Sequence, residues 1–418
     1  MKILVVCQHY YPEPFRLPDI CEELVSRGHE VTVITGEPNY PEGDLYPGYE
    51  NHKRAGEDET IRGVRVHRCH TVPRKTGVLR RVLNYYSFAA SGKKYAKSTA
   101  CTAADGSPFD VVFVNQLSPV MMANPALAYK KKHGMPLVIY TLDLWPESLT
   151  AGGIRRGSLI YRHYHKVAER IYRAADRILV SSQMFRGYFE KEFGIATAAY
   201  LPQYAETLFT PDACKKTPDG TVDLMFAGNV GAAQGVDTII RAAALTKEIP
   251  NLRWHIVGGG SELEHIRALA KDLHAHNVIF HGRQPVEKMP EYYAMADAML
   301  VTMKENPVIS YTLPGKVQTY MAAGKPIVAS ADGETADVIR TSGCGFVSPA
   351  GNEKMLVDNV LRLMEEKQFE ALGAAALAYC EHTFSKEKVM RDLITALEAC
   401  AGQSEEQKDE NVKALAIK

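Results

Sequence analysis

Short apolar runs alternate with amphipathic helical patterns along most of this chain, and few folds accommodate such an alternation. In the first half, apolar runs cover residues 3–6, 31–35, 111–114, 137–140, 178–181 and 199–202, and the first helical pattern covers 18–27. Gly28 follows that pattern directly, where helices commonly end on a left-handed residue. Strands that alternate with helices need crossover connections, so this half is predicted to form an α/β, doubly wound parallel sheet covered on both faces.

The same alternation starts again near residue 223. Predicted strands cover 224–227, 254–257, 278–281, 298–302 and 326–330, and predicted helices begin near 237, 261, 289 and 316. Residues 202–218 contain prolines and short polar stretches without a strong period, which is typical of a linker. We therefore expect domains at 1–203 and 204–382, a helix at 383–402 that packs back on the first domain, and a polar, frayed tail at 403–418.

The charge balance argues against long-range attraction to nucleic acid, because 49 Lys and Arg residues are matched by 49 Asp and Glu residues. The eight cysteines are scattered, without the paired spacing of zinc or thiol redox motifs, so they predict no metal site. No run of eighteen apolar residues occurs, and the run at 3–6 is too short for a secretory signal core. We expect a cytoplasmic protein, with peripheral contact to the inner face of the cell membrane.

Glycine-rich loops follow predicted strands of the second series. Residues 228–235 carry Gly228, Gly231 and Gly235, residues 258–260 are all glycine, and Arg283 follows the third strand. Glycines let a backbone approach a phosphate closely, and the following helix N-terminus offers free N–H groups, so a diphosphate is expected at the first loop. A plain strand-to-helix turn would contain the same glycines, and close packing alone would explain residues 258–260.

A Pro-Gly turn precedes the predicted helix at 316–322 and places Lys316 in its first turn. A cation at that position opposes the helix dipole, whereas a bound anion would offset the conflict. Lys316 is therefore a second indication of an anionic ligand. A solvated lysine at a helix start is the alternative.

Several of these segments occur together in one known family. Residues 228–235, 258–260, 280–283, 296–298 and 320–326 have the order and spacing of the retaining GT-B glycosyltransferases of family 4. In the first half, residues 10–14, 27–31, 38–41 and 143–148 resemble the branch that contains the N-acetyl-L-fucosamine transferase of O-antigen and capsule synthesis. The resemblance covers about residues 1–400, and the segments at 38–41 and 143–148 are its most specific part.

The resemblance implies a GT-B fold, in which two facing Rossmann-like domains bind the acceptor and the nucleotide-sugar in the cleft between them. It implies retaining transfer of an N-acetylated hexosamine or 6-deoxyhexosamine from a UDP-sugar to a lipid-diphosphate-linked saccharide in surface polysaccharide synthesis, without a metal or other cofactor. The donor-binding residues that it implies are Gly228, Asn229, Gly231, Gln234, Gly235, Gly258, Gly259, Arg283, Tyr311, Pro314, Gly315 and Thr319.

Two departures from the family pattern bear on donor binding. The usual Arg and Lys of the first glycine loop are Asn229 and Gln234 here, so two charge-assisted contacts become neutral and more of the diphosphate charge rests on Lys316. The family's pair of glutamates maps onto Tyr311 and Thr319. A threonine offers the ribose fewer hydrogen bonds than a carboxylate, so the donor is held differently or the activity is lower.

Asp143, Glu147 and Lys316 are the predicted catalytic residues. A carboxylate at Asp143 or Glu147 would orient the acceptor hydroxyl or shield positive charge on the sugar, and Lys316 would stabilise the departing diphosphate. Many relatives carry a histidine where this chain has Leu142. In the alternative, Asp143 caps the following helix and Glu147 is exposed. The predicted acceptor-side residues are Tyr11, Arg16, Asn39 and Tyr40.

Residues 74–97 are basic, aromatic and amphipathic, and residues 155–177 repeat that composition. Such a helix can lie on anionic lipid, which predicts a membrane contact through 74–97. An ordinary surface helix with solvated lysines has the same composition.

Two rival functions remain open at this level. A UDP-sugar 2-epimerase would share the two-domain architecture but would need no acceptor. A non-catalytic pseudo-glycosyltransferase partner would account for the replaced glutamates.

Overall fold

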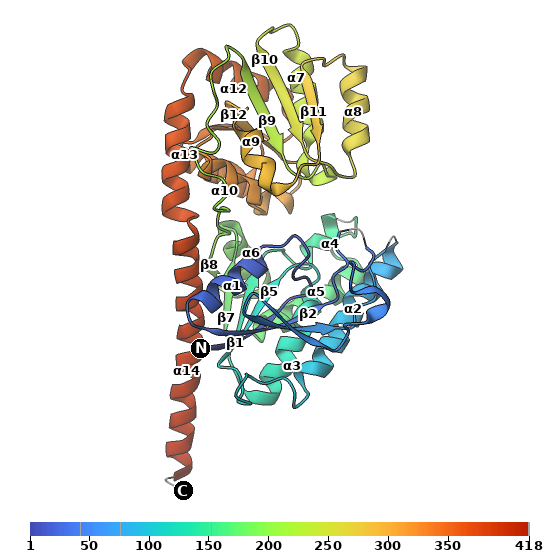
Figure 1. Ribbon diagram of the computed structural model, residues 1–418, viewed down its shortest axis with the longest axis vertical. Coiled ribbons are helices and arrows are strands. Elements are labelled where there is room, and N and C mark those ends of the chain that lie inside the picture. The colour runs from blue at the N-terminus through green and yellow to red at the C-terminus, as the bar shows by residue number, and fades with distance from the viewer. Residues whose placement is uncertain (42, 76, 152, 417–418) are drawn as a thin grey trace. The chain divides into compact units, whose positions relative to one another are not determined.

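The computed structural model describes residues 1–41, 43–75, 77–151 and 153–416. The chain forms two compact units (Figure 1). Unit 1 comprises Met1–Ser181, Phe185–Leu201 and the chain from Met390 onward, and unit 2 comprises Ser182–Met184 and Pro202–Val389. Most of unit 2 is therefore inserted between two parts of unit 1. The sequence had predicted a single boundary between the two domains, at residue 203.

Unit 1 is built on an eight-stranded sheet with the order β3-β4-β2-β1-β5-β6-β7-β8. The strands are β1 (Lys2–Val6), β2 (Glu30–Gly36), β3 (Asp58–Ile61), β4 (Val64–Cys69), β5 (Val111–Gln116), β6 (Leu137–Thr141), β7 (Arg177–Val180) and β8 (Ala199–Tyr200). Neighbouring strands are parallel except β3 with β4. The strand order reverses at β1, which lies between β2 and β5, and such switch points are where open α/β sheets bind ligands.

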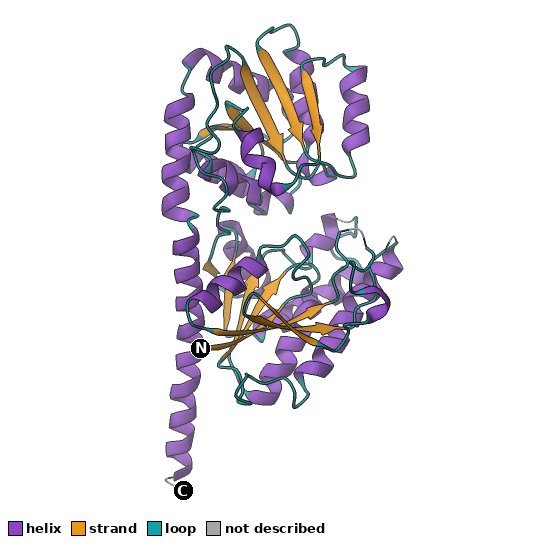
Figure 2. Cartoon of the chain, viewed as in Figure 1, coloured by secondary structure: helices purple, strands orange, loops and turns teal. Residues whose placement is uncertain are grey.

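Most helices of unit 1 lie between its strands along the chain, whereas α14 comes after all the strands of unit 2 (Figure 2). They are α1 (Leu17–Ser26), η1 (Glu50–His52), α2 (Val78–Ala96), η2 (Val120–Ala123), α3 (Asn124–His133), α4 (Glu147–Ala151), α5 (Leu159–Arg173), α6 (Gln183–Phe193) and α14 (Lys386–Ala416). The predicted helix at 18–27 and the predicted strands match these elements to within a few residues. The β3–β4 hairpin was not predicted, because its first strand is short and polar.

Unit 2 is built on a six-stranded, fully parallel sheet with the order β11-β10-β9-β12-β13-β14. The strands are β9 (Val222–Ala227), β10 (Leu252–Val257), β11 (Val278–Gly282), β12 (Ala298–Thr302), β13 (Ile327–Ser330) and β14 (Gly345–Ser348). The helices are η3 (Ala232–Gln234), α7 (Val236–Leu245), α8 (Leu263–Asp272), η4 (Val286–Lys288), α9 (Met289–Tyr293), η5 (Ile309–Tyr311), α10 (Gly315–Ala322), α11 (Gly333–Ser342), α12 (Glu353–Glu366) and α13 (Phe369–Thr383). The sheet is thus doubly wound, as predicted.

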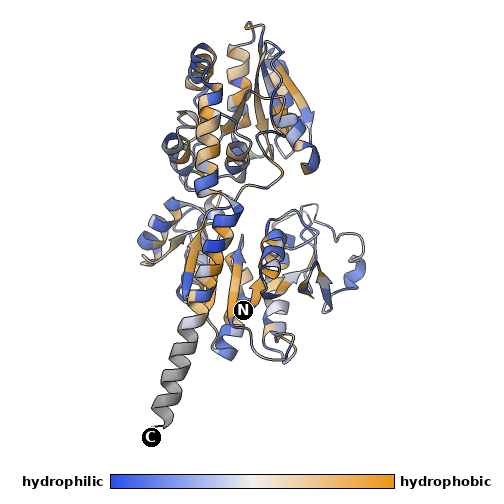
Figure 3. Cartoon of the chain, turned by 60° about the vertical axis from the view of Figure 1, so that its left-hand side comes forward, coloured by the Kyte–Doolittle hydropathy of each residue, from blue (hydrophilic) through white to orange (hydrophobic). Residues whose placement is uncertain are grey.

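Both faces of the second sheet are covered by apolar cores. Along β9 the side chains alternate: Leu224 and Phe226 pack with helices α7, α8 and α12, whereas Met225 and Ala227 pack with α10, α11 and α13. Figure 3 shows the same organisation, with hydrophobic strands inside and hydrophilic colour on the outer surfaces of many helices. A sheet buried on both faces fixes the positions at which its strands end, and the loops that follow those ends are therefore held rigidly.

Helix α14 begins at Lys386, and its residues from Met390 onward belong to unit 1. Its buried side chains recur at helical spacing, at Met390, Leu393, Leu397 and Cys400. The residues predicted to form a polar, frayed tail continue this helix to Ala416, because they contain many strong helix formers and no proline. Residues 417–418 of that predicted tail lie outside the described residues. None of the described helices is both long and apolar enough to cross a membrane.

Candidate functional site

The first two glycine loops of unit 2 pack backbone against backbone at the carboxyl ends of β9 and β10. The Gly228 N–H donates to the Val257 carbonyl at 2.9 Å, and the Val230 N–H donates to the Gly259 carbonyl at 2.8 Å. A Cβ atom on Gly258 would lie 1.8 Å from the Gly228 carbonyl oxygen, and the φ of Gly258 is +146°. Glycine is therefore required at Gly258 both by conformation and by the close approach of the two loops.

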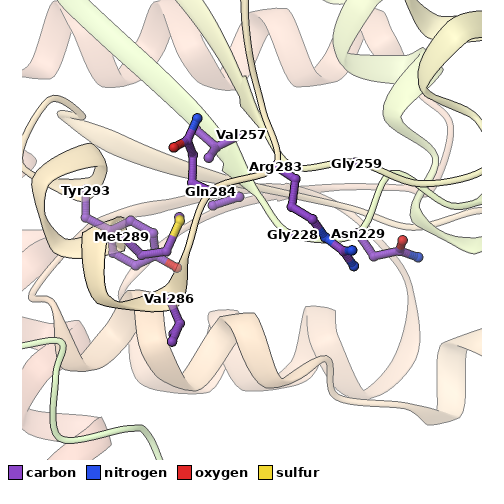
Figure 4. Close-up of a pocket in the computed structure, with 11 residues that line it drawn as sticks. Gly228, Asn229, Val257, Gly259, Arg283, Gln284, Val286, Met289 and Tyr293 are labelled. Carbon is purple, nitrogen blue, oxygen red and sulfur yellow. The ribbon is translucent and has the colours of Figure 1, made fainter. Parts of the chain in front are cut away.

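These loops form one wall of a pocket of about 270 Å³. Its lining residues are Ala227, Gly228, Asn229, Val257, Gly258, Gly259, Arg283, Gln284, Val286, Met289 and Tyr293. Figure 4 shows Val286, Met289 and Tyr293 on one side of the pocket, and the side chains of Arg283 and Asn229 on the other. One side is apolar and the other polar, which suits a ligand with a flat apolar part and an anionic part.

Lys316 is held beside the first glycine loop. Its ammonium donates to Gln234 Oε1 at 2.6 Å and lies 3.7 Å from the centre of the Phe226 ring. A Cβ atom on Gly228 would meet Lys316 Nζ at 3.1 Å, so the ammonium lies against the backbone of the loop. Burial lowers the pKa of Lys316 to about 7, and neither Gln234 nor Phe226 supplies a negative charge that would raise it again. An anion bound here would supply the missing counter-charge.

Helix α10 starts beside this cation, with Pro314 as its N-cap and Gly315 as its first residue. Thr319 is buried, and its hydroxyl donates to the Lys316 carbonyl of its own helix at 2.9 Å. The Tyr311 carbonyl accepts a hydrogen bond from Ser182 at 2.6 Å. These four predicted donor residues do not line the pocket.

The remaining predicted donor residues shape the loop or line the pocket. Gly228, Asn229, Gly258, Gly259 and Arg283 line it. Gly231 and Gly235 flank helix η3, and Gly235 adopts the left-handed conformation that starts α7.

Sequence reasoning assigned no role to six residues that line the pocket, namely Ala227 and Val257 at the strand ends and Gln284, Val286, Met289 and Tyr293 beyond Arg283. The last four carry its larger side chains. These four lie on or near α9, whose helical pattern was predicted without a role. Their only sequence signal was that Gln284 and Val286 follow Arg283 in the loop after β11. Val286, Met289 and Tyr293 form the apolar side of the pocket.

In unit 1, Asp143 and Glu147 lie in different environments. Asp143 follows β6, its carboxylate accepts the Ser118 N–H at 3.0 Å, and burial raises its pKa. Glu147 is buried, not exposed as one reading of the sequence expected, and it accepts hydrogen bonds from Tyr161 at 2.6 Å and Tyr188 at 3.2 Å. The contacts of Glu147 are thus structural, whereas Asp143 is the carboxylate at the end of a central strand.

Two of the four predicted acceptor-side residues, Asn39 and Tyr40, contact a carboxylate that was not predicted. Glu13 is buried, and its oxygens accept the N–H groups of Asn39 at 2.9 Å and Tyr40 at 2.7 Å. It also contacts His9 Nδ1 at 3.0 Å. The Asn39 amide oxygen accepts from Asn84 at 3.2 Å, so Asn39 links the loop after β2 to helix α2.

Tyr11 and Arg16 lie nearby in the chain. Tyr11 is 41% exposed and lies under the Arg62 guanidinium, 5.6 Å from the centre of its ring. Arg16 precedes α1. Burial of Tyr140 raises the pKa of its hydroxyl, and the positive charge of Arg16 partly offsets this rise. Exposed Tyr11 is available to a ligand, whereas the Asn39 amide is engaged within the fold.

Two protein-family models match this chain, one in each unit. Residues 15–202 match the family described as Glycosyl transferase 4-like domain, and residues 213–376 match the family described as Glycosyl transferases group 1. Together the two matches extend over most of the chain.

Similar proteins extend over nearly the whole chain. A protein of Escherichia coli strain K12, provisionally named colanic acid biosynthesis glycosyl transferase WcaI, is 25% identical over 418 residues, covering 94% of this chain and 99% of that protein. Sucrose-phosphate synthase from Thermosynechococcus elongatus has a TM-score of 0.74 at 17% identity, over 95% of this chain and 98% of that chain.

A third similar protein was solved with ligands. Anabaena Alr3699/HepE, in complex with UDP and glucose, has a TM-score of 0.68 at 17% identity, covering 95% of this chain and 99% of that chain. These likenesses confirm the predicted fold class, an α/β GT-B fold with two Rossmann-like units.

Proposed function

We infer that this chain transfers a sugar from a UDP-sugar. The premise is that it belongs to the glycosyltransferases, since one part matches the Glycosyl transferase 4-like domain and another matches Glycosyl transferases group 1. The acceptor we propose is a lipid-diphosphate-linked saccharide in surface polysaccharide synthesis. The sugar we propose is an N-acetylated hexosamine or 6-deoxyhexosamine, and its anomeric configuration is retained.

One observation carries this proposal, namely the position of Lys316. The cation lies between the backbone of a glycine loop and the side chain of Gln234, and its contacts with Gln234, Gly228 and Phe226 are all neutral. Transfer of a sugar from a nucleoside diphosphate releases a diphosphate, on which charge develops in the transition state. A preorganised cation and backbone donors stabilise that charge without a metal ion.

Lys316 lies against Gly228, which lines the pocket, and the pocket itself suits a nucleoside. Tyr293 and Met289 offer apolar surface to a planar base, while Gln284 and the backbone around Arg283 offer hydrogen bonds to its edge. UDP is the nucleotide that we propose, since the similar Anabaena protein was solved with UDP and glucose.

The acceptor side of the proposal rests on unit 1. Asp143 follows a central strand at the carboxyl edge of the sheet, where a burial-raised pKa makes it a better base than an ordinary aspartate. We propose that Asp143 orients the acceptor hydroxyl or shields positive charge on the sugar. The similar Escherichia coli protein is named for colanic acid biosynthesis, which supports a polysaccharide product.

A lipid-linked acceptor requires access to a membrane surface. Helix α2 exposes Leu79, Leu83 and Tyr86 next to exposed Arg80 and Arg81. Hydrophobic side chains beside arginines are typical of helices that lie on anionic lipid. We propose that this face of α2 rests on the inner face of the cell membrane.

The proposal is tested by titrating the full chain with UDP, GDP and dTDP by calorimetry, without added metal. We expect selective UDP binding, and roughly 30-fold weaker binding by Lys316→Met, because a charge-assisted contact contributes about 2 kcal/mol. Lys271→Met is the matched control, since this exposed lysine lies on α8 in the same unit.

UDP-sugars are then incubated with a lipid-diphosphate-linked saccharide, and the product is analysed by nuclear magnetic resonance. An α-linked product from an α-configured donor supports retaining transfer. Interconversion of the donor without an acceptor would favour the epimerase. If no nucleotide binds the wild type, the replaced glutamates at Tyr311 and Thr319 have emptied the site and the non-catalytic partner role is favoured.

A further inference from the structure

Three side chains with metal-ligand chemistry meet at the carboxyl edge of the sheet in unit 1. Glu37 directly follows β2 and His70 directly follows β4, and these parallel strands pair with Gly36 opposite Cys69. Glu37 and His70 are therefore the next pair in register. His52 ends helix η1, in the segment that connects β2 to β3.

The ligand atoms of the three side chains lie close together. One atom from each lies within 4.8 Å of the others. His52 Nδ1 lies 2.6 Å from Glu37 Oε2, and His70 Nδ1 lies 3.6 Å from the same oxygen. The two imidazole rings approach edge to face, with their centres 4.3 Å apart.

The carboxylate of Glu37 is fully buried and only partly satisfied. Its Oε2 accepts the Thr71 N–H at 3.1 Å as well as the contact from His52. Its Oε1 has no hydrogen-bond partner within the described part of the chain. A buried charge with a free lone pair is unfavourable unless a cation or donor reaches it.

We propose that Glu37, His52 and His70 bind a divalent transition metal of the zinc type. Two imidazoles and one carboxylate are the ligand set of open zinc sites, which keep further positions for water or a ligand. The side chains of His52 and His70 are 34% and 51% exposed, so those positions face solvent. All three side chains belong to unit 1, whereas the residues that line the nucleotide pocket belong to unit 2.

The observed distances fit this proposal with a small adjustment. Ligands at about 2.0–2.1 Å from a tetrahedral metal lie about 3.3 Å from each other. The His70–Glu37 separation is close to this value, and the His52 side chain would move by about 0.7 Å. The Thr71 N–H would hold Glu37 in place, as hydrogen bonds to metal-binding side chains commonly do in metal sites.

A simple ion pair between His52 and Glu37 is the competing interpretation. It accounts for His52, but it leaves His70 Nδ1 3.6 Å from Glu37 Oε2 without a role. Asn51 and His52 both adopt left-handed backbone conformations, with φ of 56° and 58°, in the turn that carries the His52 imidazole.

The test uses the full chain without an affinity tag, stripped with a chelator and titrated with Zn²⁺ by calorimetry and with Co²⁺ by visible absorption. We expect one equivalent of metal and Co²⁺ bands typical of four or five coordination. His52→Ala and His70→Ala should each weaken binding about 100-fold, because each removes one of three protein ligands.

A double variant, His274→Ala with His276→Ala, is the matched control, because it removes two exposed histidines from unit 2. Its metal binding should be unchanged. Circular dichroism of each variant checks that the fold persists. Binding below one equivalent in the wild type, or equal loss in the control, overturns the proposal. No nucleotide or acceptor enters the assay, so its outcome is independent of the proposed transferase activity.

Discussion

Lys316 carries the proposed diphosphate contact, and its charge state depends on pH. The pKa of its ammonium is lowered from 10.5 to about 7 in the free protein, so near neutral pH part of the population is uncharged. A bound diphosphate favours the charged form and raises this pKa again. Binding above pH 7 is therefore coupled to proton uptake, whereas at pH 6 the lysine is already protonated.

We predict that UDP-sugar affinity falls as the pH rises from 7 to 9, by up to about tenfold per pH unit until the pKa of the complex is reached. Calorimetry in buffers with different ionisation enthalpies should detect proton uptake at pH 8 and none at pH 6. Lys316→Arg stays charged throughout this range and should bind without proton uptake. Equal proton uptake by this variant would rule out Lys316 as the titrating group.

Gly258 allows the two glycine loops to approach each other. A methyl group there would clash with the Gly228 carbonyl, and the φ of +146° also disfavours alanine. We predict that Gly258→Ala lowers the free energy of unfolding of unit 2 by about 3 kcal/mol. Hydrogen exchange of the β9 and β10 amides measures the loss.

Gly259→Ala is the control, because a Cβ atom there makes only an ordinary contact, 3.7 Å from Arg283 Cβ. It should change the exchange free energies by less than about 1 kcal/mol. If Gly258→Ala also changed the exchange free energies by less than about 1 kcal/mol, loop movement would have relieved the clash at Gly258.

At the scale of elements, Glu13 joins the loops that follow β1 and β2. It accepts backbone N–H groups from Asn39 and Tyr40, and contacts His9. We predict that Glu13→Ala destabilises unit 1 by about 3 kcal/mol, since these buried donors lose a charged acceptor. Thermal unfolding followed by calorimetry measures the effect.

Glu22→Ala is the corresponding control. Glu22 pairs with exposed Arg62 on the surface, at 3.1 Å. Surface pairs of this kind contribute less than about 1 kcal/mol. If both variants lowered the transition equally, the buried network around Glu13 would not be the cause.

Most of the parallel architecture could be predicted from the sequence. The short apolar runs of the buried strands and the amphipathic period of the helices between them are both clear. Strand β12 was predicted to the residue, since all its side chains are buried. The β3–β4 hairpin was missed because β3 alternates exposed and intermediate positions. The charge-rich end of α14 was missed because its polar composition resembles that of a disordered tail.

The candidate site was predictable where glycine and charge have local signatures. Gly228, Gly258 and Lys316 were identified on that basis, and the structure brings them together. Tyr293 and Met289 were missed because apolar residues on a short helix look like core. The group formed by Glu37, His52 and His70 could not be predicted, because it depends on the pairing of β2 with β4 and on a left-handed turn.

At the scale of the whole molecule, the balanced net charge means that membrane attraction must be local. Each Lys or Arg near an anionic surface contributes about 1 kcal/mol. We predict that the double variant Arg80→Glu with Arg81→Glu binds vesicles of anionic phospholipid at least about tenfold more weakly than the wild type. Vesicle sedimentation at low and physiological salt measures this.

The matched control makes the same charge change in unit 2, with Arg267→Glu and Lys271→Glu on α8. It should keep wild-type vesicle binding. Equal losses in the two double variants would point to net charge, rather than the face of α2, as the source of membrane affinity.

The insertion of unit 2 between two parts of unit 1 has a consequence for synthesis on the ribosome. Residues 1–181 emerge first, yet Met390, Leu393 and Leu397, which are buried residues of the same unit, are made only after all of unit 2. During synthesis, the sheet of unit 1 therefore leaves apolar surface exposed until α14 has left the exit tunnel of the ribosome. A truncated chain that ends after the nucleotide pocket but before Met390 would thus lack part of unit 1, the unit that is synthesised first.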